Sequence, residues 1–253
     1  MNNLIINADD FGITDAVTKG IFESIQNGVV SRTSAMMCSE NSKLIKSYAS
    51  ELKGKIGLHL QLTDGKPKLF SNKIPSLVDS SGRFPEKSNQ LKRINLKEIE
   101  LEWNTQMNTL LELGIRPSHI DSHHNVHRFP KAFKAICTIG KKYNLPIRPL
   151  SMNMARKLNS LNLLQNTICL EAWPDKKVTI SSLINYLLTT FNTYNKTKRP
   201  FELMCHPGYV DEELKTRSEY LEQRELELNV LSDPDLPYLL KSNNICVINR
   251  INA

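Results

Sequence analysis

Short apolar runs rich in β-branched residues alternate along the chain with longer segments of helical periodicity. This alternation is typical of β/α units built around a largely parallel sheet. The runs expected to form strands are Leu4–Asn7, Val30–Met37, Lys55–Gln61, His119–Ser122, Pro146–Arg148, Thr167–Leu170, Phe201–Cys205 and Ile245–Asn249. The segments expected to form helices are Asp15–Gln26, Ser42–Leu52, Leu96–Leu113, Lys131–Tyr143, Ser181–Tyr194 and Asp211–Leu228.

Eight strands in 253 residues match the count of a (β/α)8 barrel, although an open doubly wound sheet would show the same alternation. Residues 62–95 interrupt the pattern, because they are rich in Pro, Gly, Ser and Lys and are too many for an ordinary β/α connection. We interpret them as an insertion loop, either a lid or a substrate-binding segment, within a single catalytic domain that spans residues 1–253. Thr14 is expected to cap the first helix.

The composition argues against two classes of partner, nucleic acids and membranes. The chain has 33 Lys and Arg against 26 Asp and Glu, a net charge of +7, but the basic residues are dispersed and are not interleaved with aromatics, so no nucleic-acid partner is expected. No apolar run approaches the roughly 20 residues that span a bilayer, and no signal-like segment opens the chain. We therefore expect a cytoplasmic protein without a membrane partner. Five scattered cysteines without a CxxC pair indicate reduced thiols.

All six histidines fall in three clusters, at residues 57–63, 119–127 and 204–209, and each cluster lies at or just beyond the end of an expected strand. A fourth polar cluster, residues 7–12, follows the first strand and contains Asp9 and Asp10. Because the carboxyl ends of parallel strands meet at one edge of a sheet, these clusters can converge on one site.

Each cluster also has an ordinary structural interpretation. A histidine such as His59 on an apolar strand is commonly a hydrogen-bonded core residue, and two successive aspartates can form a helix-capping turn. In the second cluster, His119, Asp121 and His123 alternate along an extended segment and should share a face, and His124 and His127 can share a face if a helix has begun. Four histidines and one aspartate within nine residues favour a functional site over packing.

One aspartate and two histidines, with positions left for water, form the type of open site with which hydrolases activate water on a metal. Mixed nitrogen and oxygen donors suit Zn²⁺, Co²⁺ or Ni²⁺ better than Mg²⁺. The chain has no GxSxG, GxxxxGK[ST] or GxGxxG motif, which argues against serine hydrolases, P-loop enzymes and dinucleotide enzymes. Cys205 and His206 are neighbours on an expected strand and should face opposite ways, so a Cys–His dyad is not expected.

At these positions the sequence resembles the YdjC-like carbohydrate deacetylases, the family of chitooligosaccharide deacetylase. The matching stretches are residues 7–12, 57–59, 62–63, 65–67, 119–124, 126–127, 129–130 and 204–207. The resemblance implies an α/β fold, a distorted TIM-like (β/α) barrel of the glycoside hydrolase/deacetylase type. Asn125 departs from the pattern, because family members often carry a third consecutive histidine there.

The resemblance also implies roles by position. Asp10, His59 and His123 match the metal ligands, and Asp9 matches the catalytic base. By place in the chain, His206 corresponds to the acid that protonates the leaving group, and Arg148 to the arginine that orients the base. The remaining polar residues of the second cluster are expected to contact substrate or to hydrogen-bond the metal-bound histidines: His119, Asp121, His124 and His127.

The expected function is that of a metal-dependent hydrolase that removes the N-acetyl group from an N-acetylglucosamine-containing mono- or oligosaccharide and releases acetate. A chitooligosaccharide, with or without a 6-phosphate, is the expected substrate, which places the enzyme in carbohydrate metabolism and chitin degradation. The cofactor is one divalent cation, Mg²⁺ by resemblance and Zn²⁺, Co²⁺ or Ni²⁺ by ligand chemistry. A homodimer is expected. The alternatives are another barrel metallohydrolase, a phosphoesterase or amidohydrolase, and a non-catalytic protein that binds sugar or metal.

Overall fold

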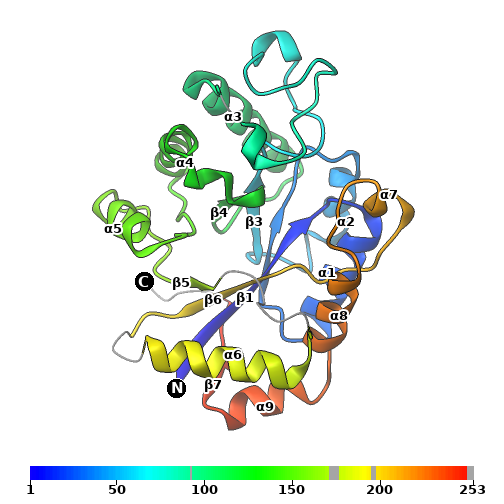
Figure 1. Ribbon diagram of the computed structural model, residues 1–253, viewed down its shortest axis with the longest axis vertical. Coiled ribbons are helices and arrows are strands. Elements are labelled where there is room, and N and C mark those ends of the chain that lie inside the picture. Colours follow the sequence, from blue (N-terminus) through cyan, green and yellow to red (C-terminus); the bar gives the residue numbers. More distant parts are fainter. Residues whose placement is uncertain (92, 171–176, 195–197, 250–253) are drawn as a thin grey trace. The chain divides into compact units, whose positions relative to one another are not determined.

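The computed structural model describes residues 1–91, 93–170, 177–194 and 198–249, in which parallel strands alternate with helices (Figure 1). Contacts between residues divide the chain into two compact units. Unit 1 contains Met1–Asp9, Thr14–Thr33 and the described residues after Gln165, and unit 2 contains Asp10–Ile13 and Ser34–Gln165. The α/β class expected from the sequence is therefore confirmed.

In unit 1 the strand order is β2-β1-β6-β5, and β7 also pairs with β1. These strands are β1 (Asn2–Phe11), β2 (Arg32–Ala35), β5 (Ile168–Leu170), β6 (Phe201–Cys205) and β7 (Ile245–Val247), and the last two residues of β1 and of β2 belong to unit 2. Strands β1 and β6 are parallel, and Ala8 lies level with Cys205 in their register. Asp9 and His206 each follow that pair directly, so the register places both residues at the carboxyl edge of neighbouring strands.

The helices of unit 1 are α1 (Asp15–Gln26), α6 (Ile180–Thr193), α7 (Glu212–Lys215), α8 (Glu222–Leu231) and α9 (Leu236–Ser242). Thr14 caps α1 as predicted, because its hydroxyl accepts from the Val17 amide at 3.3 Å. The single helix predicted over Asp211–Leu228 is wrong, since α7 and α8 are separate. The Thr216 hydroxyl donates to the Glu213 carbonyl and the Ser218 hydroxyl accepts from the Tyr220 amide, local bonds that compete with helix propagation. Helix α9 was not predicted.

In unit 2 the strand order is β4-β3-β2, with β3 at Ile56–Leu60 and β4 at Ile120–Ser122. The two strands are parallel, and His59 lies level with Asp121. The predicted strand at Pro146–Arg148 is reduced to single bridges from Ile147 to Ile120 and to Leu164. Proline has no amide hydrogen to donate to a ladder, which limits the pairing.

The longer helices of unit 2 are α3 (Leu96–Glu112), α4 (Pro130–Tyr143) and α5 (Met152–Ser160), the last of which was not predicted. Helices α3 and α4 pack against each other (Figure 1). The helix predicted over Ser42–Leu52 is a 3-10 turn (Glu40–Leu44) followed by the short α2 (Ile45–Tyr48). Among the helices in the described ranges, none combines the length and the apolar character needed to cross a membrane.

The segment at residues 62–95 is fastened to α3 through backbone amides. The buried carboxylate of Glu102 accepts from the amides of Lys68 and Leu69, at 2.9 and 3.0 Å. One turn earlier, Glu98 accepts from the Ser76 amide at 2.8 Å. Apolar side chains along the described part of the segment are buried, namely Leu62, Ile74, Leu77, Phe84 and Ile94. The segment is therefore anchored on α3 at Lys68, Leu69 and Ser76, and its role as a lid or substrate-binding segment stays a prediction.

Candidate metal centre

The end of β1 turns sharply at its paired aspartates. On a regular strand successive side chains point to opposite faces, but Asp10 has a φ of 69°, in the left-handed region, which breaks that alternation. Gly12 follows with a φ of 97°, and a Cβ there would lie 2.6 Å from the Ile45 side chain. The tight turn thus requires glycine at position 12.

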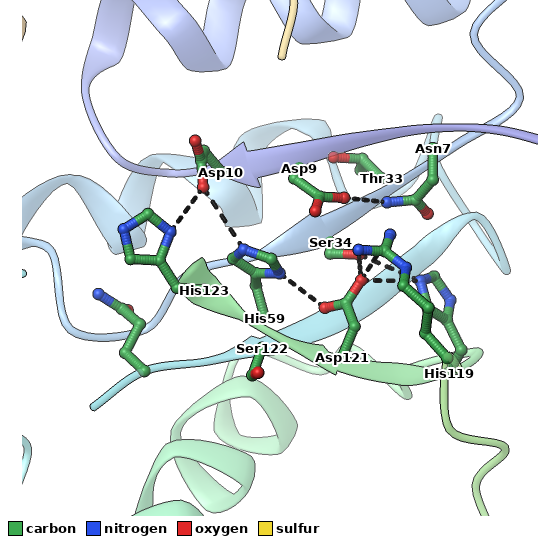
Figure 2. A network of polar contacts seen from close by, with 12 residues as sticks. Asn7, Asp9, Asp10, Thr33, Ser34, His59, His119, Asp121, Ser122 and His123 are labelled. Atoms are coloured by element: carbon green, nitrogen blue, oxygen red, sulfur yellow. Dashed lines mark hydrogen bonds and ion pairs between the residues drawn. The ribbon is translucent and has the colours of Figure 1, made fainter. Parts of the chain in front are cut away.

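Unit 2 brings Asp10, His59 and His123 together (Figure 2). Oδ1 of Asp10 lies 2.9 Å from Nδ1 of His123 and 3.4 Å from Nε2 of His59. The two imidazole rings meet edge to face, with centroids 5.5 Å apart. All three side chains are buried, and each offers a ligand atom within 4.8 Å of the others. One carboxylate and two imidazoles at this spacing fit a divalent transition-metal ion, whose ligands bind at about 2.0–2.2 Å.

Asp121 orients His59. Its Oδ1 lies 2.6 Å from Nδ1 of His59, across the level pair of β3 and β4. A carboxylate is an acceptor, so Nδ1–H donates to it and the lone pair of Nε2 is left facing Asp10. This carboxylate–histidine arrangement is the one that metal sites use to fix the ring and raise its basicity.

The second oxygen of Asp121 is also engaged. The Ser34 hydroxyl donates to Oδ2 at 2.7 Å, and Nη2 of Arg148 lies 2.7 Å from the same atom. Burial by itself would raise the pKa of Asp121, but the Arg148 guanidinium and His59 hold that pKa well below its usual range. Asp121 is therefore ionised at neutral pH. The structure thus places Arg148 on Asp121, while its expected action on the base stays a prediction.

His119 and His127 are both fully buried and hydrogen-bonded. Nε2 of His119 lies 3.1 Å from the Ser34 hydroxyl and Nδ1 lies 2.9 Å from the Ser118 hydroxyl. A Cβ at Gly57 would fall 2.3 Å from the His119 ring, so this ring needs glycine on the neighbouring strand.

His127 donates from Nε2 to the Arg148 carbonyl at 3.1 Å and accepts at Nδ1 from the Ser122 hydroxyl. Burial lowers the pKa of His127 to about 4, so the ring is neutral at neutral pH. With its ring bonded on both sides, His127 supports the backbone at Arg148, the residue that pairs with Asp121.

His124 is exposed and stacks on His123, with ring centroids 3.9 Å apart. A face shared by His124 and His127 was expected only if a helix had begun there, and that condition is not met, because His124 and Asn125 have φ values of 50° and 51° and α4 starts only at Pro130. Asparagine tolerates the left-handed region better than most residues. The left-handed conformation therefore gives a backbone reason for asparagine at position 125.

The remaining predicted residues lie in unit 1. Asp9 is buried, and its Oδ1 accepts from the Asn7 amide nitrogen at 2.6 Å. The backbone amide of His206 donates to the buried carboxylate of Glu227 at 2.5 Å, and the Tyr220 hydroxyl donates to the same carboxylate. The rings of His206 and Tyr220 meet edge to face at 5.6 Å. Glu227 therefore fixes the backbone at His206, and Tyr220 packs beside its ring.

A family model for YdjC-like proteins matches residues 3–242. The chain belongs to the YdjC-like family. It is 32% identical to a carbohydrate deacetylase of Clostridium beijerinckii, over 97% of this chain and 98% of that protein. It is 35% identical to a carbohydrate deacetylase of Enterococcus faecalis, over 97% of this chain and 96% of that protein.

A crystal structure from Enterococcus faecalis V583, of a candidate cellobiose-phosphate cleavage protein, matches this YdjC-like chain with a TM-score of 0.87 at 33% identity. The match covers 98% of this chain and 97% of that one. The predicted family and the predicted fold, a distorted barrel with a parallel sheet, are therefore confirmed.

Several residues of this YdjC-like site were not foreseen from the sequence. Ser34 joins Asp121 to His119 from β2, and Glu227 and Tyr220 hold His206. Ser34 is a small polar residue on a short strand, and Glu227 lies on a helix rich in charged residues that a solvated face would also show. Neither position carried a signal in the sequence alone.

Proposed function

We propose that this chain is a metal-dependent carbohydrate deacetylase that hydrolyses the acetamide of an N-acetylated sugar to a free amine and acetate. The observation that carries the proposal is the buried group of Asp10, His59 and His123, with Asp121 orienting His59. It occurs in a chain that matches carbohydrate deacetylases over nearly its full length.

The ligand atoms of this group indicate which kind of cofactor would bind. A divalent cation held by Asp10, His59 and His123 would polarise the acetyl carbonyl and lower the pKa of water at the site. Two imidazole nitrogens favour Zn²⁺, Co²⁺ or Ni²⁺, whereas the family resemblance suggests Mg²⁺.

The protein supplies the proton transfers. Asp9 is the general base, and its carboxylate takes a proton from the attacking water. Asp9 and Asp10 are consecutive residues, and the left-handed turn at Asp10 lets the two carboxylates serve different roles. His206 protonates the departing sugar amine, and Glu227 and Tyr220 keep His206 in place. Arg148 acts through Asp121 in holding the metal ligand His59.

The substrate proposed is an N-acetylglucosamine-containing mono- or oligosaccharide, with or without a 6-phosphate. The excess of basic residues, 33 against 26 acidic ones, is compatible with an anionic sugar. The cytoplasmic location, the homodimer and the place in chitin degradation stay predictions of the sequence.

The test is an acetate-release assay on N-acetylglucosamine, N,N′-diacetylchitobiose and their 6-phosphates, run beside a phosphate-release assay with metal content measured. We expect acetate from the wild type, metal without turnover from Asp9→Asn, and neither metal nor turnover from His59→Ala. Phosphate release without acetate would identify a phosphoesterase, and tight sugar binding without product would identify a non-catalytic protein. Acetate release by Asp9→Asn at the wild-type rate would remove Asp9 as the base.

A further inference from the structure

A continuous chain of buried polar side chains leads away from Asp9 through unit 1. The Asn7 amide nitrogen donates to Oδ1 of Asp9 at 2.6 Å, and Nε of Arg32 donates to the Asn7 amide oxygen at 2.9 Å. Nη2 of Arg32 lies 2.8 Å from Oε1 of Glu202, whose other oxygen accepts from the Thr167 hydroxyl at 3.1 Å. These side chains are all at most 5% exposed.

The chemistry of these groups leaves one orientation for the Asn7 amide. A guanidinium has donors and no acceptor, so Arg32 can bond only the oxygen end of the amide. The nitrogen end, which carries two donors, then faces Asp9, whose carboxylate only accepts. Asn7 and Asp9 are two residues apart on β1 and thus lie on the same face of the strand. Figure 2 shows the Asn7 amide directed at the Asp9 carboxylate.

The burial of the charged pair Arg32 and Glu202 costs folding free energy, and packing alone does not explain why two charges are buried here. Burying two charges is costly, and replacing such a pair by apolar residues is often neutral or stabilising. A second contact of Arg32 gives the pair a role, because Nε of the same guanidinium donates to the Asn7 amide oxygen. Glu202 lies level with Ile5 of β1, two residues before Asn7, so the pair is built into the register of β1 and β6.

We propose that Asn7 is a positioning residue for the carboxylate of Asp9, and that the buried pair of Arg32 and Glu202 sets the orientation of the Asn7 amide. This rests on the proposed function, in which Asp9 is the base. Because the base must meet a water in one geometry, a small displacement of its carboxylate lowers the turnover rate while substrate binding and metal binding persist.

The test compares four variants by kcat, KM, metal content and thermal midpoint, and the fourth combines Asn7→Ala with Arg32→Met and Glu202→Leu. Asn7→Ala removes the donor to Asp9, and the double variant Arg32→Met with Glu202→Leu removes the pair without leaving a lone buried charge. Thr33→Val is the matched control: its hydroxyl belongs to a fully buried residue and donates at 2.6 Å to the Ala8 carbonyl, so this bond holds the backbone of β1 and not a side chain.

We expect Asn7→Ala to lower kcat by about tenfold or more, with KM and metal content within about twofold of the wild type. Thr33→Val should lower the thermal midpoint with little change in kcat. Because the pair acts through Asn7, adding Arg32→Met and Glu202→Leu to Asn7→Ala should cost no further turnover.

Wild-type kcat in Asn7→Ala, or a loss of metal equal to the loss of turnover, would overturn the positioning role. So would a control variant that loses kcat as much as Asn7→Ala. Absence of acetate release from the wild type would instead contradict the proposed function itself, and the two failures are therefore distinguishable.

Discussion

Replacing Asp121 by asparagine tests two roles of its buried carboxylate, which are to pair with Arg148 and to orient His59. Asp121 and Arg148 are both fully buried and lie 2.7 Å apart. Removing the charge of Asp121 leaves the guanidinium without its counter-charge, which costs about 3–5 kcal/mol of folding free energy in comparable buried pairs. A domain of ordinary stability has about 5–15 kcal/mol, so the Asp121→Asn protein should be much less stable but should still fold.

The same substitution weakens the hold on His59. Loss of the carboxylate that orients a metal-bound histidine lowers metal affinity by about 10–100-fold. At about 1.4 kcal/mol for each factor of ten, this is about 1.4–2.8 kcal/mol of binding free energy. The two effects are measured separately, by denaturant unfolding of the metal-free protein and by titration of Zn²⁺ against a chelator of known affinity.

Ser34→Ala is the control for that experiment. It removes the hydrogen bond from the Ser34 hydroxyl to the ionised Asp121 carboxylate, worth about 1.5–3 kcal/mol because the acceptor is charged, and leaves the carboxylate beside His59 and Arg148. We expect its metal affinity to stay within about threefold of the wild type. The reasoning is refuted if Asp121→Asn binds Zn²⁺ as tightly as the wild type, because Asp121 would then have no part in orienting His59.

Three further outcomes follow from buried groups. Burial lowers the pKa of His127 from 6.5 to about 4, so the unfolded chain takes up a proton at this residue before the folded protein does as pH falls. The unfolding free energy of the metal-free protein should therefore drop by about 3 kcal/mol between pH 7 and pH 4. In urea titrations, His127→Gln should make this dependence on pH less steep. Glu102→Ala should expose residues 62–95 to proteolysis faster than the same change at exposed Glu112 does, and equal cleavage rates would contradict the anchoring described above. Burial and the nearby Glu102 raise the pKa of the Cys38 thiol well above its usual value, so an alkylating reagent at pH 8 should modify Cys38 only after unfolding; rapid labelling of the folded protein would count against this burial.

Most of what the sequence predicted about this site came from the polar residues at the ends of the expected strands. The clusters at residues 7–12, 57–63 and 119–127 could be grouped from the sequence because polar residues that follow buried strands meet at one sheet edge. The family resemblance selected Asp10, His59 and His123 from these clusters, and the structure does bring the three together. The register of β3 and β4 adds Asp121 to that group, since it lies level with His59.

The pattern of hydrophobic and polar residues does not predict the backbone conformation at this site. The left-handed conformations of Asp10 and His124 depend on the turns around them, and periodicity gives no sign of either. For the same reason the sequence left open whether a helix begins at His124, which was the condition for a face shared by His124 and His127.

Buried charges on strands were also not foreseeable. Arg32 and Glu202 are residues that are almost never fully buried unless paired, and their pairing joins positions 170 residues apart. Only the register of β1, β2 and β6 brings them together.

The most direct test of the proposed deacetylase is metal content measured on the same samples as acetate release. We expect purified wild-type protein to carry about one divalent ion per chain, held by Asp10, His59 and His123, and to release acetate from N,N′-diacetylchitobiose. Chelation should abolish that release and readdition of the metal should restore it, while His59→Ala should show neither metal nor acetate release. Acetate release by fully metal-free wild type, or by His59→Ala at the wild-type rate, would contradict the metal-dependent mechanism.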